Sequence, residues 1–314
     1  MTPAVSVVMP VRNAARFLPE ALESILGQTF ANLELVAVDD GSEDASCEIL
    51  RRYAASDSRI RLLGGPAVGI AEALNCGIRA ARGALVARMD ADDVAHPERL
   101  ARQAALMGAD PALAVLGSGC EVIDAAGTVL RTAVFPTDAA AIRDELQRRN
   151  CIAHPTVVMR RDAVLAAGGY RGAFRHCEDW DLWLRLAERH PLRNLPEPLL
   201  RLREHAGQTA WRELEPRLLA ELGACAAARL RARGRPDPVC GVASVTRPLL
   251  FAMGVGETEI NGYVRRRALD ASTEAMRAGA RRAARAAAVL ALRQRPMPWR
   301  TQCRCWLQLA RTFL

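Results

Sequence analysis

Short apolar runs alternate with amphipathic stretches over the first 90 residues of the chain. Four runs have the length and the Val, Leu and Ile content of buried strands, namely residues 4–10, 33–40, 60–65 and 84–89. Between them, apolar side chains recur at helical spacing over residues 15–29, 42–55 and 69–83. Strands that alternate with helices of about 12 residues predict a parallel, doubly wound α/β sheet.

Two of the predicted strands end in carboxylates. Asp39 and Asp40 close the second strand, and Asp90, Asp92 and Asp93 follow the fourth. Ligands of a doubly wound sheet lie beyond the carboxyl ends of its strands, so both groups would face one crevice. Two carboxylates about 4 Å apart repel by roughly 4 kcal/mol at an effective dielectric constant of 20. The second group therefore needs solvent, arginine or a divalent cation, and a solvated turn is the alternative to a metal site.

Local signals predict where two helices begin. Ser42 or Asp44 could cap the helix that follows the second strand. The stretch HPERL places Pro97 at a first helical position, with Glu98 in the first turn.

Composition excludes several classes of enzyme. All 43 basic residues of the 314-residue chain are arginine and alanine is heavily used, which indicates a coding bias, so the net charge of +8 is weak evidence for a function. A phosphate-binding loop of the GKS or GKT type, a pyridoxal Schiff base and lysine-dependent kinase chemistry each need a lysine that this chain lacks. Aromatic residues make up 4% of the chain and no recognition module is visible, so nucleic acid is not an expected partner.

Cysteine usage and hydropathy predict the compartment. Nine scattered cysteines without a CxxC pair indicate reduced thiols in the cytoplasm and no zinc site. The N-terminus carries no signal-peptide pattern, and no uncharged apolar stretch reaches about 18 residues. We expect a protein that is neither secreted by a cleaved signal nor membrane-spanning, and that could lie peripherally at the inner face of the cytoplasmic membrane.

Six segments resemble, in order and spacing, the family 2 glycosyltransferases, and the match covers roughly residues 4 to 210. The segments are VSVVMPVRNAARFLPEALESILGQTFANLELVAVDDGSEDAS, GIAEALNCGIRAARG, RMDADD, NCIAHPTVVMRRDAVLAAGGYR, CEDWDLWLRL and LLRLREHAGQTA. The resemblance implies a GT-A fold, a Rossmann-like, mostly parallel sheet flanked by helices. We expect a nucleotide-sugar-binding catalytic domain over residues 1–208 and a mainly helical, Arg/Ala-rich region over residues 209–314.

The resemblance implies how a nucleotide would be bound. Asp40 would hydrogen-bond the base with Asp39 beside it, Pro10 would line the same pocket, and Asp90 would face the ribose. The alternative for Asp39 and Asp40 is a plain turn that leads into a helix cap.

The sequence DAD matches the DXD motif of the family. The resemblance implies Mg²⁺ or Mn²⁺ held by Asp92, with Asp93 as a second possible ligand and His205 near the metal. Arg203 would neutralise the diphosphate, although Leu202 stands where relatives have an aromatic residue. A surface arginine is the alternative for Arg203.

An amphipathic helix is predicted over HCEDWDLWLRLAERH, with Trp180, Trp183, Leu184 and Ala187 on its apolar face. Glu178 and Asp179 fall in its first turn, where the helix dipole favours ionised carboxylates. By resemblance to the ED motif of the family, Asp179 would take the proton from the acceptor hydroxyl in a single inverting displacement. Glu178 and His154 would lie on the diphosphate or acceptor side. The alternatives are dipole-matched acids for the first turn and a structural histidine for His154.

The C-terminal region has two interpretations. Its helices could be solvated and pack on the catalytic domain, or form a basic surface on anionic lipid. In the second case the interfacial anchors would be Trp299, Trp306, Leu307 and Phe313.

Together these features predict a metal-dependent, inverting glycosyltransferase. It would move a sugar from a nucleoside-diphosphate sugar to a hydroxyl of a glycan or lipid-linked acceptor, in bacterial surface polysaccharide or lipopolysaccharide assembly. One alternative is a nucleotidyltransferase, but such enzymes usually have a glycine-rich, basic opening loop, and the sequence PVRNAA does not supply one. The other alternative is a nucleotide-sugar-binding protein without catalysis.

Overall fold

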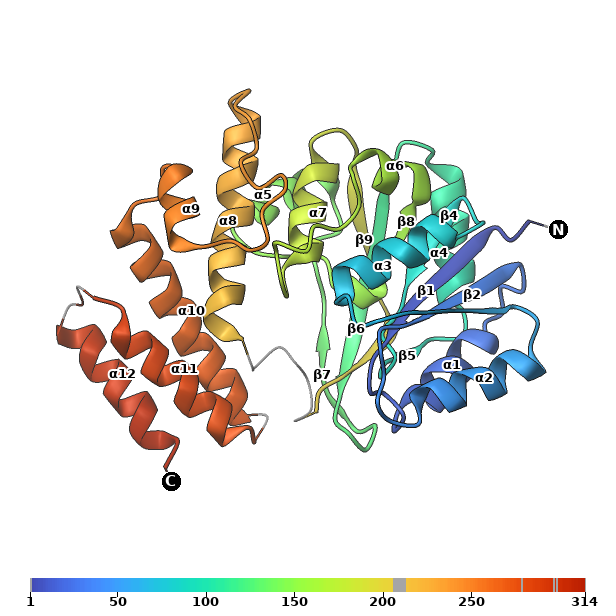
Figure 1. Cartoon of the computed structure of the whole chain (residues 1–314), viewed down its shortest axis with the longest axis horizontal. Helices are drawn as coiled ribbons and strands as arrows, with labels where there is room; N and C mark the ends of the chain where they lie inside the picture. Colours follow the sequence, from blue (N-terminus) through green and yellow to red (C-terminus); the bar gives the residue numbers. More distant parts are fainter. Residues whose placement is uncertain (1, 206–212, 278, 296, 298, 314) are drawn as a thin grey trace. The chain divides into compact units, whose positions relative to one another are not determined.

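The chain forms two compact units in the computed structural model (Figure 1). The structure describes residues 2–205, 213–277, 279–295, 297 and 299–313. The sheet unit is made of residues 1–172 and 182–203, and the helical unit of residues 173–181 and 204–314. Among the described residues, no helix is long and apolar enough to cross a bilayer.

A nine-stranded sheet forms the centre of the sheet unit. Its strands follow the order β3-β2-β1-β4-β8-β6-β9-β5, and β7 pairs with β6. The pairs β1–β2, β1–β4, β2–β3 and β6–β9 are parallel, and the others are antiparallel. The strand bounds are β1 Val5–Val11, β2 Leu33–Asp39, β3 Ile60–Gly64, β4 Leu85–Arg88, β5 Val94–Ala95, β6 Val115–Ile123, β7 Val129–Ala133, β8 Val158–Arg160 and β9 Leu192–Arg203.

Helices follow the strands as the sequence pattern predicts, which confirms the α/β class. In the sheet unit they are α1 Leu18–Leu26, α2 Ser46–Ser56, α3 Ile70–Ala80, α4 Arg99–Ala109, α5 Ala139–Leu146, the 3₁₀ turn η1 His154–Thr156, and α6 Arg161–Ala166. Helix α7, Glu178–Ala187, begins in the helical unit and continues into the sheet unit. The helical unit continues with α8 Leu214–Ala232, α9 Arg247–Ala252, α10 Glu257–Arg277, α11 Arg281–Arg293 and α12 Trp299–Arg311.

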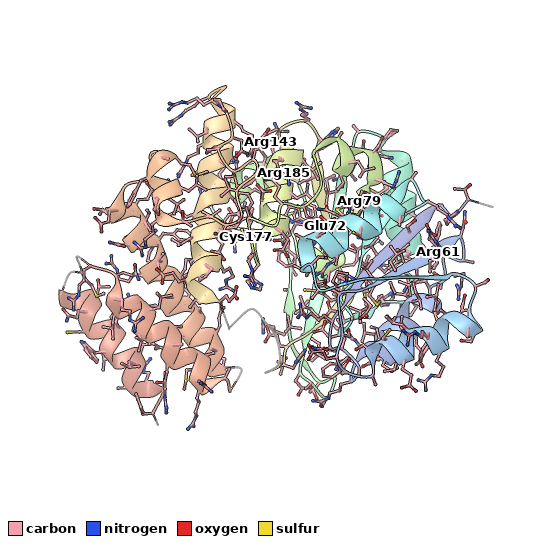
Figure 2. All side chains as sticks on the ribbon, in the orientation of Figure 1. Arg61, Glu72, Arg79, Arg143, Cys177 and Arg185 are labelled. Atoms are coloured by element: carbon pink, nitrogen blue, oxygen red, sulfur yellow. The ribbon has the colours of Figure 1, made fainter. Side chains whose placement is uncertain are left out.

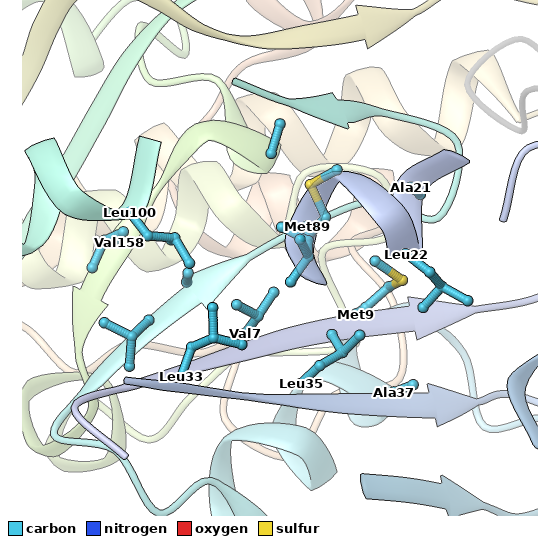
Figure 3. Packing of buried hydrophobic residues seen from close by; sticks show 14 of the residues in the cluster. Val7, Met9, Ala21, Leu22, Leu33, Leu35, Ala37, Met89, Leu100 and Val158 are labelled. Atoms are coloured by element: carbon cyan, nitrogen blue, oxygen red, sulfur yellow. The ribbon is translucent and has the colours of Figure 1, made fainter. Parts of the chain in front are cut away.

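Alternate side chains of β1 pack on opposite faces of the sheet. Val7 and Met9 belong to the buried cluster that also contains Leu22 of α1 and Leu35 of β2 (Figure 3). Val8 points to the other face, where α3 packs so closely that a Cβ atom on Gly77 would lie 2.4 Å from Val8 Cγ1. Helices on both faces therefore hold the central strands and fix the position of their carboxyl ends.

Both predicted helix starts differ from the structure. Helix α4 begins at Arg99 with Glu98 as its N-cap residue, so Pro97 lies before the helix, where its carbonyl accepts the Thr29 N–H at 2.9 Å. Helix α2 begins at Ser46 after Ala45. Asp44 is one residue too early for the N-cap position, yet its carboxylate accepts the Ser46 N–H at 2.9 Å. The loops before these helices are shaped by contacts with distant residues, which local signals do not contain.

Candidate active site

The carboxyl ends of β2 and β4 lie at one edge of the sheet. Strand β1 runs parallel between them, with Val11 in register with Asp39 and Val8 in register with Arg88. Asp40 follows β2 directly and Asp90 follows β4 after one residue. The two acidic groups therefore emerge from neighbouring parts of the same edge.

An acidic triad follows β4. One carboxylate oxygen from each of Asp90, Asp92 and Asp93 lies within 4.8 Å of the other two. Oxygen ligands at this spacing suit hard divalent cations such as Mg²⁺ and Mn²⁺. Asp90 also forms an ion pair with the buried guanidinium of Arg88.

Asp93 is the most deeply buried acid of the triad. Its Oδ1 accepts the backbone N–H of Arg203 at 2.8 Å, and within the described part of the chain its buried Oδ2 has no hydrogen-bond partner. Burial, and then the charges of Asp90 and Asp92, raises the pKa of Asp93 well above its ordinary value. A divalent cation would supply both the missing partner and the missing charge, so the residues present are suited to holding a metal.

A fully buried arginine supports the loop that carries the triad. Arg99 Nη2 donates to the carbonyl of Arg88 at 2.8 Å and to that of Val157 at 3.3 Å, and its Nε donates to Gln103 at 3.1 Å. Burial lowers the pKa of Arg99 to about 9. Sequence reasoning missed this role, because Arg99 lies beside the acids in the chain and would pass as an exposed residue of a helix.

Arg203 links three segments of the sheet unit. Its Nε donates to the carbonyl of Asp92 at 2.8 Å, and its Nη2 pairs with Glu20 of α1 at 2.6 Å. The guanidinium carbon lies 4.7 Å from the centre of the Phe17 ring. Arg203 is only 2% exposed, so the alternative of a surface arginine is wrong. These contacts hold the acidic segment, and a role toward a diphosphate stays a prediction.

The acids at the end of β2 differ in their surroundings. Asp40 is buried, and its Oδ1 accepts the N–H groups of Val68 at 2.6 Å and Gly69 at 3.2 Å. Asp39 is half-buried and accepts the Ser42 N–H at 3.2 Å. Asp40 thus holds the loop before α3, which sequence reasoning did not foresee.

The predicted residue Pro10, and Arg12, come from the end of β1, next to β2. The half-buried Pro10 lies on β1, next to last in that strand. Arg12 Nη1 lies 3.8 Å from Asp40 Oδ2.

The half-buried His154 contacts two buried aromatic residues of the sheet unit. Its Nε2 lies 2.9 Å from the hydroxyl oxygen of Tyr170, and its ring meets the Trp183 ring edge-on at a centroid distance of 6.0 Å. Loss of water around the ring, and then the charge of Arg88, lowers the pKa of His154 well below 6.5. These contacts match the structural alternative for His154, and a contact with an acceptor stays a prediction.

His154 should make the protein less stable in mild acid. Because its folded pKa is lowered, its contribution to the free energy of unfolding is fully present above pH 6.5 and is lost as the pH falls toward the folded pKa. The loss should approach about 1.4 kcal/mol per pH unit. In His154→Gln, which keeps a hydrogen-bonding side chain but does not titrate, denaturant unfolding between about pH 7 and pH 5 should depend less on pH.

A second histidine with a lowered pKa does not disturb the comparison of the two proteins. His176, whose pKa burial also lowers, is present in both proteins, so its effect cancels in the difference. Equal pH dependence in the two proteins would contradict the role of His154.

The predicted amphipathic helix is present as α7. Its apolar residues Trp180, Trp183, Leu184 and Ala187 are buried. Glu178 is buried and Asp179 half-buried in the first turn, and Asp179 Oδ1 accepts the Trp180 N–H at 2.7 Å.

The two ends of α7 belong to different units. Arg185, labelled in Figure 2, donates to the carbonyls of Ala167 and, at 2.7 Å, of Gly169, and so fixes the C-terminal half of the helix in the sheet unit. Asp179 and Glu178 belong to the helical unit, as does the half-buried His205. The acidic triad belongs to the sheet unit, so the meeting of these groups in one site stays a prediction.

Known proteins share both the fold and the sequence pattern. The chain superposes on residues 1–349 of the S. aureus protein TarS, solved in complex with UDP-GlcNAc, with a TM-score of 0.55 and 16% identity, over 98% of this chain and 90% of that fragment. For the mannosyltransferase PcManGT from Pyrobaculum calidifontis, solved with GDP-Man and Mn²⁺, the TM-score is 0.54 and the identity 21%, over 100% of this chain and 88% of that one. These likenesses confirm the expected GT-A fold.

The family follows from the sequence. The profile of "Glycosyl transferase family 2" matches residues 6–165, just over half of the 314 residues. The chain is 32% identical over 209 residues to the O-antigen biosynthesis glycosyltransferase WbnJ of Escherichia coli, which covers 65% of this chain and 81% of WbnJ. The protein belongs to glycosyl transferase family 2, and the expectation of a glycosyltransferase is confirmed.

Proposed function

We propose that this glycosyltransferase uses a nucleoside-diphosphate sugar and a divalent cation, and transfers the sugar with inversion to a hydroxyl group. The observation that carries the proposal is the acidic triad at the carboxyl end of β4, whose oxygen spacing suits a hard cation. A diphosphate carries negative charge and could approach such a surface only with a cation between them. Family membership favours glycosyl transfer over the nucleotidyltransferase alternative.

The residues of the sheet unit would divide the donor between them. Asp92 and Asp93 would hold Mg²⁺ or Mn²⁺, which when bound would stabilise the negative charge of the departing diphosphate. Asp90 would face the ribose. Asp39 and Asp40 would contact the base in a pocket that Pro10 also lines. Because Asp40 binds the backbone at 68–69, the base contact of this acid would also order the loop before α3.

The acceptor side rests on the first turn of α7. Asp179 would accept the proton of the acceptor hydroxyl as its oxygen forms a bond to the anomeric carbon and the bond to the diphosphate breaks. A single displacement of this kind inverts the anomeric configuration. Glu178 and His154 would lie on the acceptor or diphosphate side, and His205 and Arg203 near the metal and the diphosphate.

The biological setting is a proposal as well. The name of the relative WbnJ refers to O-antigen biosynthesis, which supports an acceptor that is a glycan or lipid-linked intermediate in cell-surface polysaccharide or lipopolysaccharide assembly. Such an acceptor would place the enzyme in the cytoplasm, peripheral at the inner face of the membrane. Residues 1–208 would form the catalytic domain and residues 209–314 a helical extension.

A thermal-unfolding screen tests the donor and the cation together. The screen compares UDP-, GDP- and dTDP-sugars. We expect the sugar nucleotides of one of these three bases to raise the midpoint temperature of unfolding, and only when Mn²⁺ or Mg²⁺ is present. A ligand at 100 times its dissociation constant should add about 2.7 kcal/mol to the free energy of unfolding. The matched controls are each cation alone and each sugar nucleotide with EDTA. Stabilisation by nucleoside triphosphates but by no sugar nucleotide would contradict the proposal.

A further inference from the structure

Helix α12 presents several large apolar side chains to solvent. Trp306 is 55% exposed, Leu307 63%, and Phe313, just beyond the helix, 64%. Trp306 and Leu307 recur at three- to four-residue spacing with the exposed Cys303 and Ala310, so these four form one face of the helix, and Phe313 continues that face beyond the helix end. We call this the apolar face of α12. The side chain of Trp299, another predicted anchor, lies outside the described residues.

The packed side of α12 is largely polar. Gln308 donates to Ser272 of α10 at 3.3 Å, and the carbonyl of Thr312 accepts from Arg285 of α11 at 3.0 Å. Cys305 and Thr312 are fully buried. A surface helix of a globular protein normally turns its apolar stripe inward, so this helix is reversed. The interpretation that the helices are simply solvated does not account for an outward stripe of Trp, Leu and Phe.

Arginine side chains lie beside the apolar face. Arg304 and Arg311 are exposed on α12 itself, and the Arg285 guanidinium lies 4.0 Å from the centre of the Phe313 ring. Residues 281–314 contain eight arginines and no aspartate or glutamate, although the whole chain has 35 acids. The general preference for arginine explains the basic residues but not the absence of acids.

We propose that the apolar face of α12 docks on an anionic lipid bilayer. Trp306, Leu307 and Phe313 would enter the boundary between headgroups and acyl chains, and Arg304 and Arg311 would bind headgroup phosphates. A second copy of the chain is the competing occupant. It would bring the same arginines of two molecules together, and the acid-free segment offers no counter-charge. The proposal does not depend on the donor or the chemistry of the catalytic site.

Vesicle sedimentation of the full-length protein tests this surface. The wild type should sediment with vesicles of equal parts phosphatidylglycerol and phosphatidylcholine, and much less with phosphatidylcholine alone. The double variant Trp306→Ser with Leu307→Ser should lower partitioning to the anionic vesicles by about tenfold or more. The double variant Arg304→Gln with Arg311→Gln should lower partitioning to the anionic vesicles by about fivefold per arginine. Added salt should likewise lower the partitioning of the wild type.

Matched variants in the helical unit separate docking from general stickiness. Phe251→Ser removes another exposed aromatic residue, and Arg233→Gln with Arg235→Gln removes two other exposed charges. Both should partition like the wild type. All four variants should keep the circular dichroism of the wild type, and if the tryptophan variant misfolds, the Arg304 and Arg311 variant still decides.

Three outcomes would overturn the docking proposal. One is wild-type protein that stays in the supernatant with anionic vesicles. Another is equal loss of binding in the control variants. The last combines two measurements: light scattering shows that the wild type is a dimer and the Trp306 and Leu307 variant a monomer, while both partition equally to vesicles. The apolar face would then be an interface between copies.

Discussion

Asp179→Asn should slow sugar transfer by a factor of about 100 to 10,000 while leaving donor binding nearly intact. The substitution keeps the size of the side chain and an oxygen that can accept the Trp180 N–H, so the first turn of α7 should stay folded. It removes the group that would take the proton from the acceptor. Initial rates with donor and acceptor, and the donor-induced shift in thermal unfolding, measure the two effects separately.

Glu188→Gln is the matched control for this substitution. It neutralises an exposed carboxylate just beyond the C-terminal end of the same helix, and the transfer rate should not change. Full turnover in Asp179→Asn would remove Asp179 from the mechanism. Loss of donor binding together with turnover would show that Asp179 acts on the donor and not on the acceptor.

Asp92→Asn should abolish the effect of Mn²⁺ on both donor binding and transfer. Removing one of three convergent carboxylates leaves Asp90, which is already paired with Arg88, and the buried Asp93. We expect the transfer rate to fall by about a hundredfold or more, since the charge that the departing diphosphate acquires would lack its counter-ion. Rates measured against Mn²⁺ concentration, with EDTA as the zero point, give the apparent metal affinity of each protein.

Glu98→Gln controls for the loss of a nearby negative charge. Glu98 is half exposed and pairs with Arg102 on the surface of α4, so this variant should keep the metal dependence of the wild type. If EDTA leaves the wild-type rate unchanged, or if Asp92→Asn responds to Mn²⁺ like the wild type, the triad is not the metal site.

The order of strands and helices up to β4 was predictable from the sequence. Buried strands here are short runs of Val, Leu and Ile, and each helix between them repeats its apolar residues at helical spacing, so the signal is contained within a few neighbouring residues. The acids after β2 and β4 were also visible, because parallel strands connected by helices place their carboxyl ends on one edge. The family resemblance then gave these acids their expected roles.

Contacts between distant residues decided the rest. Arg203 pairs with Glu20, which is 183 positions away, and no local pattern distinguishes this buried arginine from the many exposed ones. Likewise, the sequence of α12 shows an apolar and a polar side but not which of them faces α10 and α11. The sequence alone determined the local elements and the chemistry available at the strand ends. Only the tertiary structure decided which arginines are buried and which helix face is exposed, because burial depends on the packing of segments far apart in the chain.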